Sequence, residues 1–132
     1  MTQEYKQLLL KDLSTRLPYG VKVKTPYNDA KLIGIVKRKG FKKDVDYIDA
    51  VTNKETYPIQ YVQPYLHPIS SMTKEEEDEF VSFTDTMFRF GEDDSLCVLP
   101  LDAISWLNKK MFDYRGLIKK GLAIEAPEEI YK

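Results

Sequence analysis

The chain has 132 residues, of which 42% are hydrophobic and 12% aromatic, a composition typical of one globular domain over residues 1–132 and not of a disordered segment. Its apolar runs are far shorter than the ~20 residues that a membrane span needs. Its first residues lack the basic and apolar regions of a signal peptide, so we expect a cytoplasmic protein.

The net charge of −1 hides an uneven distribution along the chain. Residues 1–66 carry 12 Lys and Arg against 7 Asp and Glu, whereas residues 67–132 carry 8 against 14. Such a division indicates either two surfaces with different partners or two halves of one domain that attract each other. The second interpretation is favoured.

The first segment, over residues 2–16, has the pattern of an amphipathic helix. Its apolar residues recur at the i, i+3, i+4 and i+8 spacing of one helical face: Tyr5, Leu8, Leu9 and Leu13. Asp12 falls outside this face. Thr2 is a suitable N-cap, and Pro18 with Gly20 ends the helix.

Over residues 21–62 the apolar period changes to two, which predicts four strands joined by tight turns. The predicted strands comprise residues 21–24, 31–37, 44–52 and 56–62. The second is apolar on both faces and therefore central, and Pro58 near the start of the fourth indicates an edge strand. That fourth strand places Tyr57, Ile59 and Tyr61 on one face. Strongly curled antiparallel meanders of this size often close, so we expect a small SH3-like barrel.

Residues 63–68 are expected to form an irregular bridge, because neither proline in this segment can donate to a strand ladder. Residues 73–121 are the predicted helical part. They open on a capping box, with Thr73 as N-cap and Glu76 at N3, and the helix that follows runs to about Phe88.

Residues 96–99 are predicted to form a short buried strand that holds the single cysteine, Cys97, as an inert thiol. Pro100 suits the first position of a third helix. The apolar face of that helix comprises Ile104, Leu107 and Met111.

Two capping signals lie near the end of the chain. Asp113 can cap one more short turn, and Gly121 has the position of a C′ glycine, with Leu122 where a Schellman motif places its hydrophobic contact. Residues 126–130 are expected to be partly ordered. The predicted fold class is therefore α+β: an N-terminal helix, a curled antiparallel four-stranded meander, and two or three C-terminal helices.

The sequence lacks the motifs of most known catalytic and cofactor sites. It contains no Gly-rich phosphate loop, no G-x-S-x-G, no C-x-x-C and no H-E-x-x-H. With one histidine, His67, and one cysteine, it cannot build a His- or Cys-based metal site of the usual ligand count. We therefore expect no catalytic site, cofactor or metal, and carboxylate-based catalysis by unidentified Asp and Glu residues stays open as an alternative.

Seven of the nine tyrosines lie in the first half of the chain. Tyrosine combines a large rigid ring with a polar tip, which suits binding surfaces. On a small barrel, Tyr61, Pro64 and Tyr65 would form a shallow peptide groove. Ordinary packing is the competing explanation, because β-strands favour tyrosine. The leading hypothesis is a non-catalytic module that binds a protein partner.

A basic run at a predicted hairpin tip is the second candidate binding site. Its residues are Lys37, Arg38, Lys39, Phe41, Lys42 and Lys43. Cations that contact phosphates, together with a ring that stacks on a base, are what sequence-independent binding of single-stranded nucleic acid requires. A solvated hairpin whose lysines oppose aggregation explains the same residues and is favoured.

Three segments of the chain carry a resemblance to a known group of proteins. They read RLPYGVKV from Arg16, VQPYLHPISSMT from Val62, and WLN followed by FDYRGLIKKGLAIEAPE, from Trp106 and Phe112. In these segments the chain resembles an uncharacterised family of short proteins encoded by gut bacteria and by their phages or mobile elements. The resemblance implies a phage or mobile-element setting, and it brings no activity, cofactor or catalytic residue.

Overall fold

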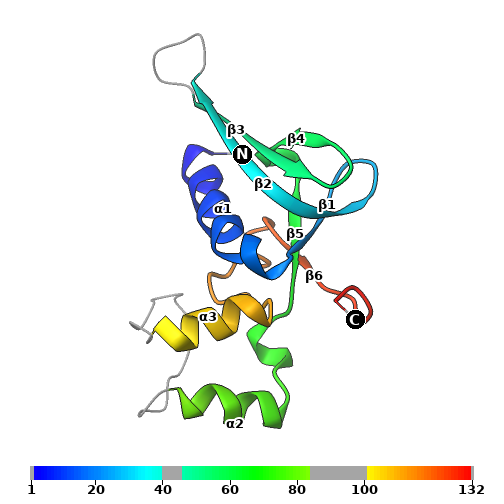
Figure 1. The fold of residues 1–132 in the computed structure, drawn as a ribbon. Coiled ribbons are helices and arrows are strands. Elements are labelled where there is room, and N and C mark those ends of the chain that lie inside the picture. Colours follow the sequence, from blue (N-terminus) through cyan, green and yellow to red (C-terminus); the bar gives the residue numbers. More distant parts are fainter. Residues whose placement is uncertain (1, 40–45, 84–100, 132) are drawn as a thin grey trace.

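The computed structural model of the chain describes residues 2–39, 46–83 and 101–131 (Figure 1). Within these ranges the fold class is α+β, as predicted. In chain order the elements are α1 (Gln3–Arg16), β1 (Lys22–Lys24), β2 (Asp29–Lys39), β3 (Asp46–Thr52), β4 (Thr56–Pro58), β5 (Gln63–Leu66), α2 (Lys74–Ser82), α3 (Leu101–Lys109) and β6 (Ile124–Glu125). Short 3-10 helices cover Leu17–Tyr19, Ile59–Tyr61 and Ile69–Ser71.

The predicted first helix is confirmed as α1. Thr2 is its N-cap, and the Thr2 hydroxyl accepts a hydrogen bond from the Tyr5 N–H at 3.1 Å. Leu9 and Leu13 are fully buried in the main core. The chain leaves the helix through Gly20, whose φ of 76° is the left-handed conformation that glycine adopts most readily.

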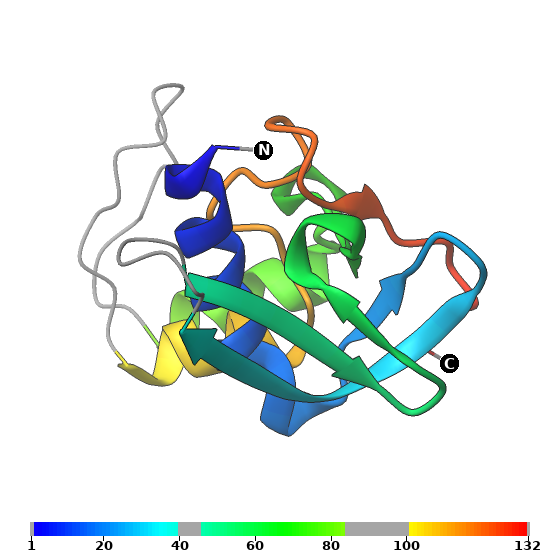
Figure 2. The same cartoon turned by 90° about the horizontal axis from the view of Figure 1, so that it is seen from above.

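The described strands form one open sheet in the order β4-β3-β2-β1-β5-β6. β4 and β6 are its two edges and do not pair with each other, so a closed barrel is not observed. The position of β4 confirms the edge strand that Pro58 predicted, and β2 is central as expected. Figure 2 shows α1 across one face of the sheet, where its leucines pack against Leu32, Ile48 and Ala50.

The longest strand pair, β2 and β3, contains a β-bulge that sets which side chains face outward. The register shifts between Leu32 and Gly34, so that Leu32 pairs with Thr52 and Gly34 with Val51. Leu32 points into the core and is 1% exposed, while its neighbour Ile33 is 56% exposed on the other face. Beyond the bulge the alternation resumes and turns Val36 outward.

Two predictions for residues 56–68 were wrong. The fourth strand ends at Pro58 and continues as a 3-10 helix, so Ile59 is buried whereas Tyr61 is exposed instead of sharing its face. Residues 63–66 form β5 rather than an irregular bridge. Pro64 lies across from Val23 in β1, and the pairing of β5 with β6 starts only at the next residue, Tyr65. The proline is therefore tolerated, because no described strand needs the backbone N–H that it lacks.

The later helices enclose a second apolar cluster. The predicted capping box of α2 is present, with the Glu76 N–H donating to the Thr73 hydroxyl at 3.1 Å and the Thr73 N–H donating to the Glu76 carboxylate at 3.0 Å. The buried residues of the cluster are Phe80, Ala103, Trp106, Leu107 and Phe112. The prediction that this helix runs to about Phe88 was wrong, because α2 ends at Ser82 with Phe83 as its C-cap. The predicted strand at residues 96–99 with Cys97 and the helix start at Pro100 lie outside the described residues.

The last described segment confirms both capping predictions. The Asp113 carboxylate accepts hydrogen bonds from the backbone N–H groups of Leu117 and Ile118, at 2.8 and 2.9 Å. Gly121 has a φ of 75°, and the Leu122 N–H donates to the Leu117 carbonyl at 2.9 Å, as in a Schellman motif.

The chain beyond these caps is held more firmly than the sequence predicted. β6 pairs in parallel with β5, and the Ala126 N–H donates to the Leu66 carbonyl at 2.8 Å. The Tyr131 hydroxyl donates to the Tyr65 carbonyl at 2.7 Å and accepts from the Lys22 N–H at 3.1 Å. The segment expected to be partly ordered therefore joins the two inner strands β1 and β5. Among the described helices, none is long and apolar enough to span a membrane.

Candidate functional site

The face of β2 and β3 that α1 leaves uncovered exposes three large apolar side chains. Ile33, Val36 and Tyr47 are 56%, 45% and 54% exposed. Arg38 lies directly across from Tyr47, and Val36 is two residues before Arg38, so these side chains share one face of the ribbon. Ile33 reaches the same face because of the bulge. We call Ile33, Val36 and Tyr47 the apolar sheet face.

Cationic residues of β2 border this apolar sheet face. Arg38 is exposed and forms an ion pair with the Asp49 carboxylate. Lys37 and Lys39 are exposed as well, and Lys37 has an interaction of its own. The structure therefore places half of the predicted basic run on the β2–β3 ribbon. The other half, Phe41, Lys42 and Lys43, lies outside the described residues.

The predicted groove of Tyr61, Pro64 and Tyr65 does not exist as one open surface. Tyr61 is 57% exposed, whereas Pro64 is buried and Tyr65 is 7% exposed. The Tyr65 hydroxyl donates to the Asp29 carboxylate at 2.6 Å. Burial, followed by this hydrogen bond, raises the pKa of Tyr65 to about 12. Pro64 and Tyr65 belong to the packing because β5 is an inner strand, which the prolines of this segment concealed.

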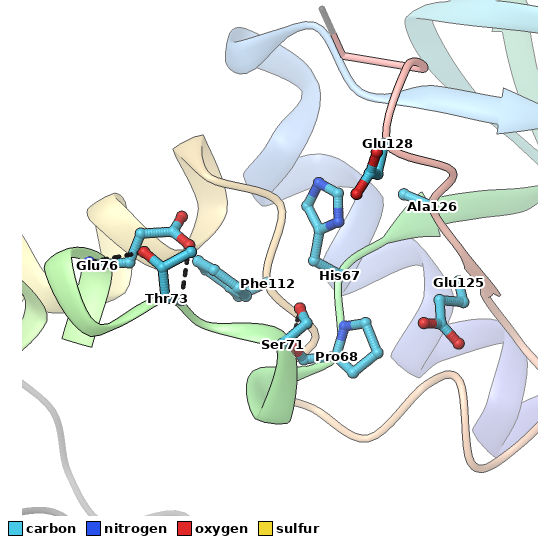
Figure 3. Close-up of a pocket in the computed structure, with 9 residues that line it drawn as sticks. All are labelled: His67, Pro68, Ser71, Thr73, Glu76, Phe112, Glu125, Ala126 and Glu128. Atoms are coloured by element: carbon cyan, nitrogen blue, oxygen red, sulfur yellow. Dashed lines mark hydrogen bonds between the residues drawn. The ribbon is translucent and has the colours of Figure 1, made fainter.

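A pocket of about 500 Å³ lies between the end of β5, the start of α2 and the segment that follows β6 (Figure 3). His67, Phe112 and Glu128 line it, together with residues of both neighbouring segments. The His67 ring lies 6.0 Å, between centroids, from the rings of Phe112 and Tyr131. The sequence pointed to His67 only as a metal ligand without enough partners, and it did not predict this pocket, because the walls of the pocket come from distant parts of the chain.

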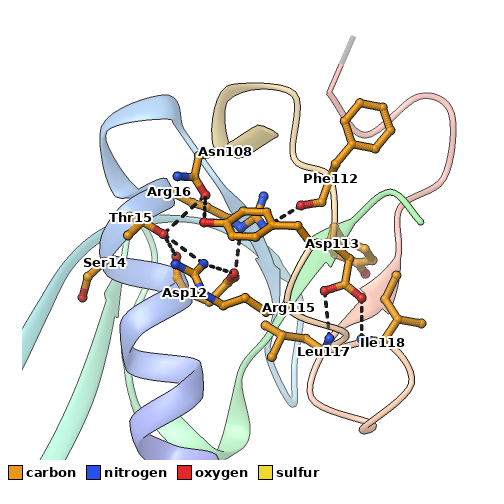
Figure 4. Close-up of polar contacts among 12 residues, drawn as sticks. Asp12, Ser14, Thr15, Arg16, Asn108, Phe112, Asp113, Arg115, Leu117 and Ile118 are labelled. Carbon is orange, nitrogen blue, oxygen red and sulfur yellow. Dashed lines mark hydrogen bonds and ion pairs between the residues drawn. The ribbon is translucent and has the colours of Figure 1, made fainter. Parts of the chain in front are cut away.

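A buried polar cluster connects α1 to the chain after α3 (Figure 4). The Arg16 Nε and Arg115 Nη1 atoms donate to the two oxygens of Asp12, at 2.9 and 2.7 Å. Arg16 also donates to the Phe112 carbonyl at 2.6 Å. Both guanidinium groups lie against the Tyr114 ring, 5.3 and 4.5 Å from its centroid. Asp12 and Arg16 are fully buried, so Asp12 does not belong to a solvated face of the helix.

The cluster has the chemistry of a structural clamp. Asp12 accepts from two guanidinium groups and Asp113 from two backbone N–H groups, so each oxygen of both carboxylates already accepts a hydrogen bond from the protein. The sequence carried one local hint, the i, i+4 pair of Asp12 and Arg16. In the part of the chain that the structure describes, there is no group of three or more His, Cys, Asp or Glu residues that could hold a metal ion.

Comparison of the chain with protein-family models, with curated proteins and with solved structures found no match in any of the three.

Proposed function

We propose that this chain is a non-catalytic protein-binding module whose binding surface is the apolar sheet face. The observation that carries the proposal is the exposure of Ile33, Val36 and Tyr47, each by about half, on one face of two neighbouring strands around the Arg38–Asp49 ion pair. Contiguous exposed apolar side chains with a polar rim are characteristic of protein interaction sites. An exposed tyrosine within such a patch is a frequent centre of binding energy.

The charges around the apolar sheet face define the chemistry of the partner. Lys31 and Arg38 are exposed on β2 on this face. Complementary electrostatics then favours a protein surface with an apolar centre and an acidic rim. The edges of the sheet are poor alternatives for adding a partner strand, since β4 has three residues including Pro58 and β6 has two.

A non-enzymatic role is supported by the contacts that four aspartate carboxylates make within the chain. Asp12 and Asp113 are occupied as described above, and Asp49 is paired with Arg38. Asp29 accepts the Tyr65 hydroxyl. We therefore do not extend the carboxylate-enzyme alternative to any of these residues. A cytoplasmic, phage or mobile-element setting, as the family resemblance implies, is part of the same proposal, and small binding proteins suit it.

The test compares two tyrosines of equal exposure on different surfaces. Tyr47→Ala and Val36→Asp remove or charge the apolar sheet face, whereas Tyr61→Ala changes a tyrosine that is 57% exposed elsewhere. A partner recovered by affinity capture and identified by mass spectrometry is then titrated against each purified variant. We expect Tyr47→Ala to weaken binding by about 2 kcal/mol, with Tyr61→Ala unchanged. A partner that binds the Val36→Asp variant as tightly as wild type would rule out this surface.

Nucleic acid is the second candidate ligand of this surface, because Arg38 lies directly across from Tyr47. A cation beside an exposed ring is the arrangement that binds single strands by phosphate contact and stacking. The assay is fluorescence anisotropy with a labelled single-stranded oligonucleotide at low salt. Each phosphate contact contributes about 0.7 to the slope of log K against log salt, so Arg38→Gln should lower that slope. Capture that nuclease treatment abolishes would favour this second function over the first.

A further inference from the structure

The pocket beside His67 is independent of the apolar sheet face and is built on fixed walls. The His67 N–H donates to the Met111 carbonyl at 2.7 Å, and the Asp113 N–H donates to the His67 carbonyl at 2.8 Å. On the opposite wall the Ala126 N–H is bonded to Leu66 at 2.8 Å, and the capping box fixes Thr73. A cavity of about 500 Å³ with such walls is within the size range of small-ligand sites, about 300–1,000 Å³.

The charged residues of this pocket indicate the sign of the charge that its ligand carries. Glu76, Glu125 and Glu128 line it, and among its described lining residues there is no Lys or Arg. The N-terminus of α2 does not make the pocket favour an anion. The capping box already uses the N–H groups of Thr73 and Glu76, and the first helical turn is acidic. The pocket therefore favours a cation over an anion.

The three glutamates are too far apart to bind a single metal ion together. Within the described chain, no three His, Cys, Asp or Glu side chains converge closely enough to hold one metal ion. The carboxylates come instead from separate walls, with Glu125 and Glu128 on one side and Glu76 on the other (Figure 3). A ligand that reaches more than one of them must be extended and carry hydrogen-bond donors.

His67 and the apolar lining residues suit the remaining parts of such a ligand. The ring nitrogens of His67, which lines the pocket, have no hydrogen-bond partner among the residues that the structure describes, so they are free to contact a ligand. Pro68 and Ala126, which are partly exposed and line the pocket in front of the buried Phe112 ring, give an apolar wall against which a methylene chain can pack. Donors at the head and methylenes in the stem describe an alkyl ammonium or an alkyl guanidinium.

We propose that the pocket between His67, Phe112 and Glu128 binds an organic cation, namely an ammonium or guanidinium group on a short aliphatic stem. The chemistry is shared by the Lys and Arg side chains of a peptide and by free polyamines. The two sources differ in length and charge number, and separate probes distinguish them.

The experiment is a titration of the full chain at low ionic strength with N-acetyl-arginine amide and, separately, with spermidine. Trp106 is the single tryptophan and stacks on Phe112 with 5.7 Å between ring centroids, so its fluorescence reports on the pocket. N-acetyl-citrulline amide, which has the same shape without the charge, is the ligand control. We expect saturable binding of at least one cationic probe and no binding of the citrulline analogue.

Matched glutamate variants locate the binding. Glu128→Gln and Glu125→Gln remove one pocket charge each, whereas Glu129→Gln removes a neighbouring exposed charge that does not line the pocket. We expect about tenfold weaker binding for each pocket variant, as for a lost charged hydrogen bond, and an unchanged affinity for Glu129→Gln. Absence of saturable binding at millimolar probe, equal binding of the citrulline analogue, or equal effects of all three variants would overturn the proposal.

Discussion

Asp12 accepts hydrogen bonds from two arginines, and the side chains of Asp12, Arg16 and Arg115 are 0%, 0% and 9% exposed. Removing charges from water costs several kcal/mol per ion, which an excellent mutual geometry must offset. Here the offset comes from three charged hydrogen bonds of 2.6–2.9 Å and from the Tyr114 ring. The Nη1 atom of Arg16 is buried without a hydrogen-bond partner, and its guanidinium group lies against the face of that ring.

Replacing Asp12 should therefore be among the most destabilising single changes in the chain. Asp12→Asn leaves two buried guanidinium groups without their counter-charge, and we expect a loss of about 3–5 kcal/mol in the free energy of unfolding. Urea denaturation measures this loss. Asp78→Asn, at an exposed position of α2, is the control and should change stability by less than about 0.5 kcal/mol. Equal stabilities of the two variants would mean that the clamp adds nothing.

The raised pKa of Tyr65 predicts how the free energy of unfolding changes in alkaline solution. Its pKa is raised to about 12 by burial in the folded chain, against about 10 in the unfolded chain. As the pH rises through this window the unfolded chain loses the phenolic proton first, so the free energy of unfolding falls. Tyr65→Phe should start about 1 kcal/mol less stable at pH 8, through the lost hydrogen bond to Asp29. Its stability should then fall less steeply above pH 10, measured as urea midpoints; parallel curves would contradict the assignment.

At the scale of elements, the boundaries that the sequence predicted well are those set by contacts within a few residues. The capping box of α2, the Asp113 cap and the Gly121 turn depend on neighbours at most five positions away. β5 and the buried clamp depend on residues far apart in the chain, such as Arg115 and Asp12. No pattern in one segment contains that information, and the prolines around Tyr65 pointed away from a strand.

The cap at the start of α2 has a measurable energy. Thr73→Ala removes the hydroxyl that accepts from Glu76 N–H and should lower the free energy of unfolding by about 0.5–2 kcal/mol. Ser70→Ala, three residues earlier on the surface, is the matched control and should be neutral within about 0.5 kcal/mol. Thermal or urea unfolding compares the two. A neutral Thr73→Ala variant would show that the first turn of α2 is stabilised by other contacts.

For the candidate site, the structure exposes a different tyrosine from the one that the predicted groove needs. Tyr47 is exposed on the apolar sheet face, whereas Tyr65 is packed. Period-two alternation could place Tyr47 in a strand, yet the bulge that turns Ile33 to the same face arises from pairing between two strands. The walls of the pocket beside His67 come from segments far apart in the chain, so no pattern within one segment predicts the pocket.

At the scale of the whole molecule, the described residues form two apolar clusters, one under the sheet and one between α2 and α3. They are joined by polar contacts that cross between them. Arg16 donates to the Phe112 carbonyl, and the Thr15 hydroxyl lies 3.4 Å from the Asn108 side-chain oxygen. Because these contacts are buried or partly buried, opening one cluster exposes the polar groups of the other.

We therefore expect the two clusters to unfold together. Trp106 fluorescence follows the helical cluster, and far-ultraviolet circular dichroism follows the whole chain. In urea the two transitions should coincide for the wild type, as two-state unfolding requires. In Asp12→Asn the loosened connection should separate them, with Trp106 exposed at the lower urea concentration. Separate transitions in the wild-type chain would show that the clusters are independent.

The pairing of β5 with β6, the last strand of the chain, has a consequence for synthesis of the chain. When residues up to Leu66 have been made, β1 to β5 can pair, but the carbonyls of Tyr65 and Leu66 await partners from residues 126 and 131. A nascent chain at that stage presents β5 as an uncovered edge strand, and such edges pair with other chains. Ribosomes that stall before residue 124 should thus release products that aggregate or recruit chaperones, although nearly all of the sheet is already encoded.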